Sequence, residues 1–214
     1  MRRSKTKHFA APIVLVTIYG LLIGCSSSPP SRYYTLEEQL TTTIQVTAEP
    51  LAVRVGPIRM ARYIDRPQIV TRIQSNELKV AEYDRWIEPL DQSFQRILTN
   101  NLADNLSSPL VYEFGAGASG DMLINYQVLA SVMRFDVDQN NIATLDVQWT
   151  LTGRKVDHIY LAQRTVFTVE ADSKSYSDRA AAMSTLIAEF AQDIAERIVQ
   201  VNLAAANGAA PISQ

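Results

Sequence analysis

The sequence contains little cysteine, glycine and proline, and each shortage excludes a class of protein. Its 214 residues include 1 Cys, 8 Gly and 9 Pro. A single Cys excludes a disulfide-stapled fold and a zinc site built from cysteines. The low Gly and Pro contents exclude a collagen-like or low-complexity chain. What is there is an ordinary globular composition, 47% hydrophobic and 20% charged.

Long hydrophobic runs are also scarce. Residues 9–24 form the single long apolar stretch, and its 16 residues fall short of the roughly 20 that a membrane-spanning helix needs. This shortage excludes a polytopic membrane protein. Residues 1–24 hold four basic residues and no acid, which leaves 16 basic and 22 acidic residues, a net charge of −6, in the rest of the chain. This acidic remainder gives no basic footprint for nucleic acid.

The first 24 residues have the order of a secretory signal peptide. A basic segment, residues 1–7, precedes the apolar stretch, and Pro12 lies within that stretch. An uncleaved anchor and a buried core helix are the alternatives. The polar, proline-containing sequence directly after Cys25 argues against the core helix. We therefore expect residues 1–24 to be a signal peptide.

Residues 22–25, Leu-Ile-Gly-Cys, resemble the bacterial lipobox. The small residue before the cysteine lets the peptidase approach the backbone, and the thiol of Cys25 receives a diacylglycerol. Since each buried CH₂ contributes about 0.8 kcal/mol, several acyl chains anchor a protein firmly. Cys25 is therefore the expected lipid-attachment site, and no cofactor other than this covalent lipid is expected. Ser26, where Asp would favour the inner membrane, points to the outer membrane.

The rest of the chain divides into three parts. Residues 25–31 are the lipidated cysteine and a Ser/Pro tether with no core-forming side chains. Residues 32–203 have the length of one domain. Residues 204–214 are small and polar, so we expect them to form a disordered tail.

Hydrophobic periodicity predicts strands and two helices within this domain. Period-two patterns and turn signals place strands at 51–58, 68–74, 77–83, 122–137, 142–153 and 159–170, and apolar residues spaced by three and four place helices at 89–106 and 177–203. Both amphipathic helices must bury an apolar stripe. We therefore expect an α+β fold, a two-layer sandwich of a mostly antiparallel sheet with two helices on one face.

Catalytic and metal-binding patterns are weak or missing. Residues 115–120 match G-x-G-x-x-G, but a strand is expected after them, where a nucleotide-binding fold needs a helix, so we interpret them as a flexible loop. His158 is the one histidine after Cys25, and no cluster has metal-ligand spacing. There is no G-x-S-x-G elbow. The sequence therefore predicts neither an enzyme nor a metal site.

Residues 63–72 and 85–90 are rich in Arg and aromatic side chains. One interpretation is structural: Arg66 or Arg85 pairs with a neighbouring acid, and Trp86 fills the seam between sheet and helix. The other is a partner-binding surface, since Arg, Tyr and Trp are favoured anchors of interfaces. The candidate partner-binding residues are Tyr63, Asp65, Arg66, Gln68, Arg85 and Trp86.

These stretches, in this order and behind a lipobox, resemble the PqiC (YmbA-type) family of ABC-type transport auxiliary lipoproteins. The resemblance covers about residues 25–106, and the remainder agrees in length and element order. The segments that carry it are 32–36, 53–58, 63–72, 85–90 and 96–102. One departure is Met-Ala-Arg at 60–62, where a Pro is expected.

The resemblance implies a TolB-N-terminal-like domain in a lipoprotein of the outer membrane that faces the periplasm. It implies two partners, an inner-membrane transporter component and a periplasmic MCE-domain protein that forms a lipid conduit. Members of the family can self-associate into rings. The resemblance brings no catalytic residues.

Three functions follow for comparison. In the first, the protein docks an MCE-type lipid-transport assembly at the outer membrane. In the second, it is an outer-membrane assembly lipoprotein, or one that binds lipopolysaccharide, with a similar fold. The third, an envelope hydrolase, is disfavoured because His158 is the only plausible base.

Overall fold

The computed structural model describes residues 28–39, 50–115, 124–153 and 158–206. The chain divides after Pro30 into two compact units. The second unit, Ser31–Gln214, holds every helix and strand described here. Cys25, most of the 115–120 glycine segment and the end of the expected tail lie outside the described residues.

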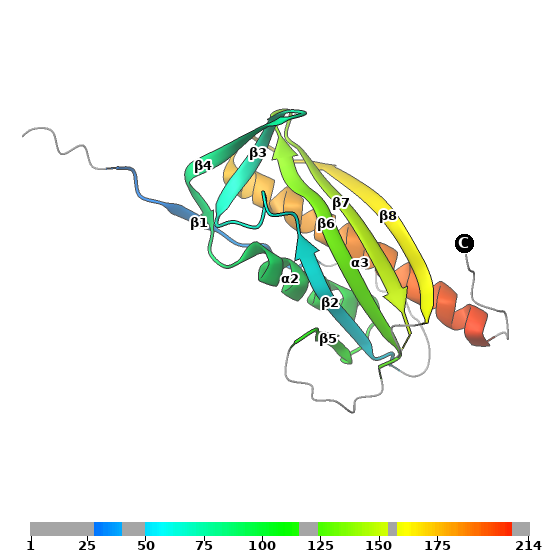
Figure 1. Cartoon of the computed structure of the whole chain (residues 1–214). Coiled ribbons are helices and arrows are strands. Elements are labelled where there is room, and N and C mark those ends of the chain that lie inside the picture. Colours follow the sequence, from blue (N-terminus) through cyan, green and yellow to red (C-terminus); the bar gives the residue numbers. More distant parts are fainter. Residues whose placement is uncertain (1–27, 40–49, 116–123, 154–157, 207–214) are drawn as a thin grey trace, which may run out of the picture. The chain divides into compact units, whose positions relative to one another are not determined.

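An eight-stranded sheet and two helices make up the described part of this unit (Figure 1). In chain order the elements are β1 (Arg32–Tyr34), β2 (Val53–Met60), β3 (Gln68–Gln74), β4 (Glu77–Trp86), α2 (Leu90–Asn105), β5 (Val111–Glu113), β6 (Tyr126–Asp138), β7 (Ile142–Thr152), β8 (Ile159–Glu170) and α3 (Tyr176–Ala206).

The sheet is mixed. Its three antiparallel pairings are β3 with β4, β6 with β7 and β7 with β8, which are neighbours along the chain. The other four pairings, β1–β4, β2–β5, β2–β6 and β3–β6, are parallel. The expectation of a mostly antiparallel sheet is therefore wrong, because it considered only strands joined by short turns. Parallel neighbours need longer crossover connections, which join segments far apart in the sequence.

Strand β6 pairs with other strands along both of its edges. β7 pairs with it over most of its length. On the other edge, β2 pairs with its first half, and β3 pairs with its last residues, Val137 and Asp138. Residues from three separate parts of the sequence are thus brought together at the end of β6.

Both helices cover the same face of the sheet (Figure 1), as the amphipathic patterns predicted. α2 begins directly after Pro89 and buries Phe94, Ile97, Leu98 and Leu102, which lie on one side of the helix. α3 extends to Ala206, three residues beyond its expected end. The α+β class and the pair of helices are confirmed.

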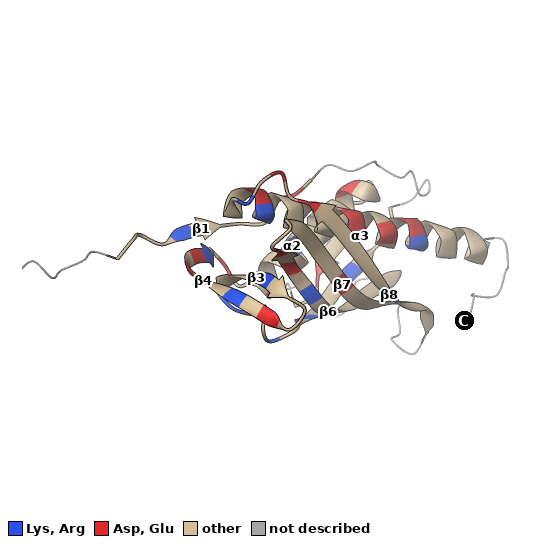
Figure 2. Ribbon diagram, turned by 90° about the horizontal axis from the view of Figure 1, so that it is seen from above, with Lys and Arg blue, Asp and Glu red and all other residues tan. Residues whose placement is uncertain are grey.

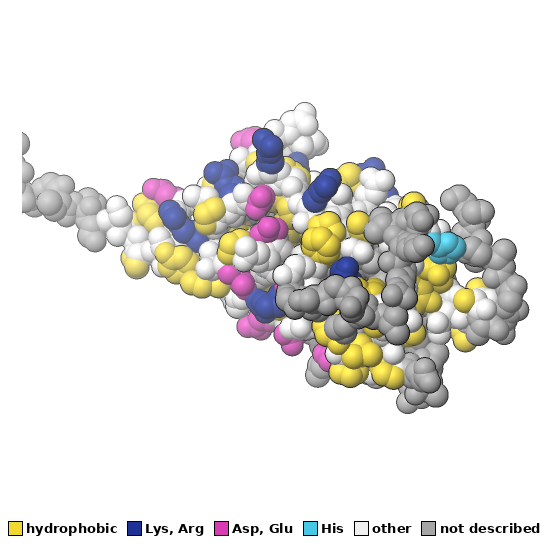
Figure 3. Space-filling view, turned by 60° about the horizontal axis from the view of Figure 1, so that its bottom comes forward, with side chains coloured by type: hydrophobic (Ala, Val, Ile, Leu, Met, Phe, Trp, Pro, Cys, Tyr) yellow, Lys and Arg dark blue, Asp and Glu magenta, His cyan; other side chains and the backbone are white. Residues whose placement is uncertain are grey.

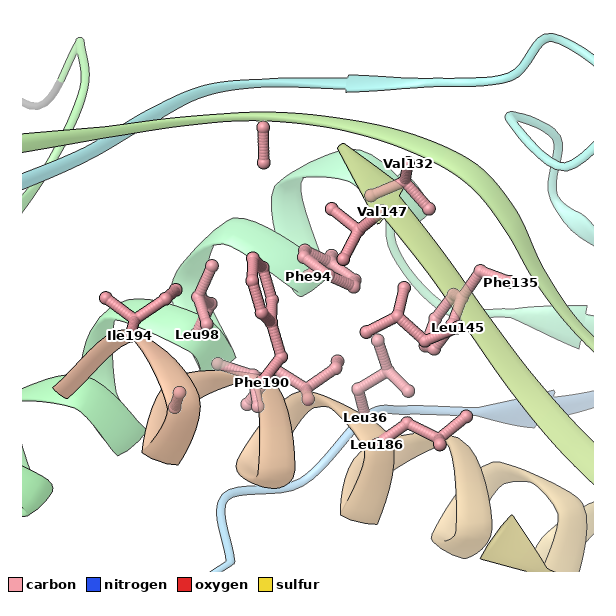
Figure 4. Packing of buried hydrophobic residues seen from close by; sticks show 14 of the residues in the cluster. Leu36, Phe94, Leu98, Val132, Phe135, Leu145, Val147, Leu186, Phe190 and Ile194 are labelled. Atoms are coloured by element: carbon pink, nitrogen blue, oxygen red, sulfur yellow. The ribbon is translucent and has the colours of Figure 1, made fainter. Parts of the chain in front are cut away.

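Aromatic residues from both helices meet the sheet in one core (Figure 4). Phe94 of α2 contacts Phe135 of β6 edge-to-face, with ring centroids 5.3 Å apart. Phe190 of α3 contacts Trp149 of β7 in the same way at 5.7 Å. Burial of each such side chain contributes about 1.5–3 kcal/mol, so this core fixes the sheet on which the surface residues lie.

Candidate functional site

A buried carboxylate links β3 to β6. Asp136 of β6 is fully buried, and its Oδ2 lies 2.8 Å from Arg72 Nη2 while its Oδ1 lies 2.9 Å from Arg134 Nε. The hydroxyl of Tyr63 donates to Asp136 and accepts a hydrogen bond from Arg72. Two guanidinium groups therefore share one carboxylate, with the hydroxyl completing the network. We call these four residues the Asp136 cluster.

Burial and neighbouring charges shift the pKa values of two members of this cluster, Tyr63 and Arg72. Burial raises the pKa of the Tyr63 hydroxyl, and Asp136 raises it further, whereas Arg72 lowers it. The hydrogen bond to Asp136 raises the pKa of Arg72. Tyr63 therefore stays neutral and Arg72 charged around neutral pH, and this favours a structural network over proton transfer.

An open groove of about 660 Å³ lies over the Asp136 cluster. It is formed where the β3–β4 turn approaches the β6–β7 turn. Six of the residues that line it are Tyr63, Arg72, Ser75, Met133, Arg134 and Asn140. The groove thus combines two cations, the acid Asp138, several hydrogen-bonding groups and one exposed apolar side chain, a mixture suited to a protein contact.

A second surface lies at the other end of β4, where the described chain begins. The register pairs Tyr33 of β1 with Arg85 of β4, and Arg85 with Gln68 of β3, so these side chains share one face of the sheet. Arg66 Nε donates to Gln68 Oε1 at 3.3 Å. Tyr33 and Ile87 are 58% and 61% exposed. We call Arg32, Tyr33, Arg85 and Ile87 the β1 surface.

Strand β1 is fastened to β4 by an ion pair beneath this surface. Arg32 donates to both oxygens of Asp84 at 2.7 and 3.0 Å, and the Tyr34 hydroxyl donates to the same carboxylate at 2.8 Å. The Asp84 side chain is 8% exposed, whereas that of Arg32 is 65% exposed. Asp84 therefore fixes β1 from below and leaves the guanidinium of Arg32 accessible to solvent.

The structure divides the candidate partner-binding residues between these two places. Tyr63 belongs to the Asp136 cluster and lines the groove. Gln68 and Arg85 lie side by side next to the β1 surface, and Arg66 is hydrogen-bonded to Gln68. Asp65 is exposed in the turn between β2 and β3, where its backbone N–H donates to the carbonyl of Ala61.

Trp86 lies in the core, as the structural interpretation of its segment predicted. It is 6% exposed and lies beside Leu90 and Phe135. Its side chain therefore supports the seam between sheet and helix and presents no surface to a partner.

Sequence reasoning missed Asp136, Tyr33 and Ile87. An Asp flanked by apolar residues in a strand pattern was a signal for a buried carboxylate. Nothing in the sequence indicated that β1 adds to the edge of β4, since the strand has only three residues. Tyr33 could be placed next to Arg85 only from the register.

His158 contacts an aromatic ring and a backbone amide among the described residues. Its ring lies edge-on to Tyr160 with centroids 4.5 Å apart, and its backbone carbonyl accepts from the N–H of Gly153. In the part of the chain that the structure describes, no three His, Cys, Asp or Glu residues gather as metal ligands. Over the same residues, no helix has both the length and the apolar character to cross a membrane.

A family model described as an ABC-type transport auxiliary lipoprotein component matches residues 34–195. The chain belongs to this family. The matched segment runs from the last residue of β1 into α3, so it includes the groove and, of the β1 surface, Arg85 and Ile87. The chain is therefore an auxiliary lipoprotein of ABC-type transport systems.

Solved structures support the fold of this auxiliary lipoprotein. One crystal structure of an uncharacterized protein has a TM-score of 0.65 at 16% identity, covering 79% of this chain and 99% of that one. A protein from Xanthomonas campestris, described under the family name DUF330, has the same TM-score and identity, covering 79% of this chain and 96% of its own. No curated protein matches the sequence.

Proposed function

We propose that this auxiliary lipoprotein docks a periplasmic MCE-domain conduit at the outer membrane and thereby serves an intermembrane lipid-transport system. The observation that carries the proposal is the family match over residues 34–195, and it is supported by the preceding sequence, which has the pattern of a signal peptide and resembles a lipobox at residues 22–25. Lipid on Cys25 would anchor the protein on the periplasmic face of the outer membrane. The role is one of binding and positioning, without catalysis.

The groove and the adjoining turn supply the partner-binding surface in this proposal. Tyr63 and Arg134 line the groove, and Asp65 and Arg66 are exposed in the turn that runs from Tyr63 toward Gln68, beside the β1 surface. Arg134 uses Nε to bind Asp136, and the rest of its guanidinium remains available at the groove. Arg and Tyr are frequent anchors of protein interfaces, because they combine large contact area with directed hydrogen bonds.

Copurification tests this function directly. The lipidated protein, tagged at its C-terminus, is crosslinked in cells, purified from detergent-solubilised envelopes and analysed by mass spectrometry. We expect an MCE-domain protein and an inner-membrane transporter component to accompany it. A second outer-membrane lipoprotein carrying the same tag is the control, and neither protein should accompany it.

Two results of the copurification would contradict or redirect the proposal. Recovery of the protein alone, or with an outer-membrane β-barrel and no MCE-domain protein, would contradict the docking role. The barrel result would favour the alternative of an outer-membrane assembly lipoprotein, and lipopolysaccharide in the purified complex would favour the other alternative, a lipopolysaccharide-binding role.

A further inference from the structure

Two large apolar side chains are exposed at the point where the domain begins. Tyr33 of β1 is 58% exposed and Ile87, just after β4, is 61% exposed. The backbone N–H of Ile87 donates to the carbonyl of Tyr34 at 2.9 Å, which keeps Ile87 beside β1. Hydrophobic side chains gather at this end of the described domain (Figure 3). Neighbouring exposed apolar residues at one place point to a contact surface.

Cationic side chains border this apolar pair. Arg85 is the cross-strand partner of Tyr33, and the side chain of Arg32, which turns to the other face of β1 to bind Asp84, is 65% exposed at the edge of the sheet. Two acids are nearby: Asp84 is buried under β1 and paired with Arg32, and Glu88, which follows Ile87, is partly exposed and paired with Arg96. Figure 2 shows a basic residue on β1 and both basic and acidic residues on β4, whereas acids predominate along the visible part of α3. An apolar centre with a basic border matches the interface of an anionic bilayer.

The chain length before β1 limits how far this surface can be from the proposed anchor. Six residues separate Cys25 from Arg32. At no more than about 3.6 Å per residue, the seven Cα–Cα steps from Cys25 to Arg32 span at most about 25 Å. A lipid on Cys25 therefore holds the β1 surface at high effective concentration next to the membrane, and weak contacts then suffice to seat it.

The groove lies at the opposite end of β4. Its lining includes Ser75, at the β3–β4 turn, whereas β1 pairs with residues 84–86. The 10 residues of β4 separate the two places, about 30 Å at the usual rise of a strand. A domain seated through β1 would thus leave the groove accessible to a periplasmic partner.

We infer that the β1 surface rests on the anionic phospholipid membrane that carries the anchor. Tyr33 and Ile87 enter the interfacial region, and Arg32 and Arg85 contact lipid phosphates. The inference rests on the lipid anchor in the proposed function, but it does not depend on which protein partner binds. The contact orients the domain and makes one end of β4 proximal to the membrane and the other end distal.

Site-specific fluorescence tests this orientation. Cys25 is the only cysteine and is expected to carry the lipid, so a single new cysteine can be labelled alone. The variants Tyr33→Cys and Ile87→Cys carry an environment-sensitive dye, and the lipidated proteins are reconstituted into vesicles of phosphatidylethanolamine and phosphatidylglycerol that contain a headgroup-region nitroxide lipid. Val166→Cys on β8, where Val166 is 55% exposed, is the matched control.

We expect a blue shift and several-fold stronger nitroxide quenching at positions 33 and 87 than at 166. Both effects should weaken in vesicles of phosphatidylcholine alone, since the arginines then lose their anionic partner. Equal quenching at all three positions in protein that floats with the vesicles would overturn the inference and leave the anchor intact. A blue shift already present in the unlipidated protein in buffer, without vesicles or detergent, would assign the surface to a protein contact and overturn it too. Protein that fails to float would remove both the anchor and the inference.

Discussion

Asp136 and Arg72 join two strands that are distant in the sequence, with the carboxylate fully buried and the nearest nitrogen 2.8 Å away. The pair fastens the end of β6 to β3, beside the groove. Only two residue pairs connect these strands in the backbone register, so the side chains supply much of the connection.

Replacing this carboxylate should destabilise the protein. Asp136→Asn leaves Arg72 and Arg134 facing a neutral amide, and we expect the free energy of unfolding to fall by about 3 kcal/mol. Urea denaturation followed by circular dichroism measures this loss. Asp146→Asn is the matched control because Asp146 pairs with Arg164, which is 62% exposed, and exposed pairs contribute little. Equal losses in the two variants would contradict the structural role of Asp136.

Replacing Trp86 distinguishes the structural interpretation of its segment from the interface interpretation. Trp86→Ala removes a buried indole, and we expect a loss of about 4 kcal/mol in unfolding free energy. Ile87→Ala, at the exposed neighbouring position, should leave stability nearly unchanged. Thermal denaturation of both variants compares them. A stable Trp86→Ala protein would show that the indole does not support the core.

Replacing Asp193 and replacing Asp146 should change the stability of the protein in opposite directions at neutral pH. Burial raises the pKa of Asp193, although Arg197 lowers it, so its ionisation costs stability as the pH rises through the folded pKa. Asp193→Asn should therefore be more stable than wild type at neutral pH, and this gain should vanish in acid, below the unfolded value of about 3.9. Its amide oxygen can still accept from Gln163, which donates to Asp193 at 3.3 Å.

The pH dependence of stability that Asp146 contributes should have the opposite sign to that of Asp193. Hydrogen bonds from Arg164 lower the pKa of Asp146, so its pair stabilises the fold above the unfolded pKa and is lost as the pH falls through the folded one. Asp146→Asn should then be less stable than wild type at neutral pH and indistinguishable from it in strong acid. Denaturation curves measured from acid to neutral pH test both variants, and the same sign for both would refute the assignment.

Charge reversal tests the turn as part of the partner-binding surface. Arg66→Glu should reduce recovery of the MCE-domain protein several-fold, because reversing a charge on the proposed binding surface disrupts its electrostatic complementarity with the partner. Lys79→Glu, an equal change at an exposed site on β4, should leave recovery unchanged. Quantitative mass spectrometry of the copurified proteins gives the ratio. If both variants recover as much partner as wild type, the turn does not contact the partner.

The local elements were predictable because their side chains carry the periodicity. Leu145, Val147 and Trp149 alternate with polar residues in β7 and are buried, as expected. The stripe of α2 was equally clear, and its helix extends from Leu90 to Asn105, close to the predicted 89–106. Turns of a few residues also identified the hairpins correctly.

Strand order was not predictable in the same way. The strand expected at 51–58 turns at Gly56 and continues to Met60, with a register shift between Val55 and Ile58. A side chain on Gly56 would lie 2.9 Å from Phe114 Cβ, and its φ of +111° also favours glycine. Its parallel partner, β6, begins more than 60 residues later, and no local pattern reports such a pairing. The Asp136 cluster depends on that order and was missed with it.

Strand β1 has a mechanical consequence. A pull on a lipid attached at Cys25 would reach β1 first, because this strand directly follows the tether. Residues 32–35 would come away before Leu36, which is 2% exposed and holds the chain in the core. Their release would lengthen the tether by about 14 Å. The Arg32–Asp84 ion pair would then break and re-form reversibly. The tether would lengthen under tension while the rest of the domain stays folded.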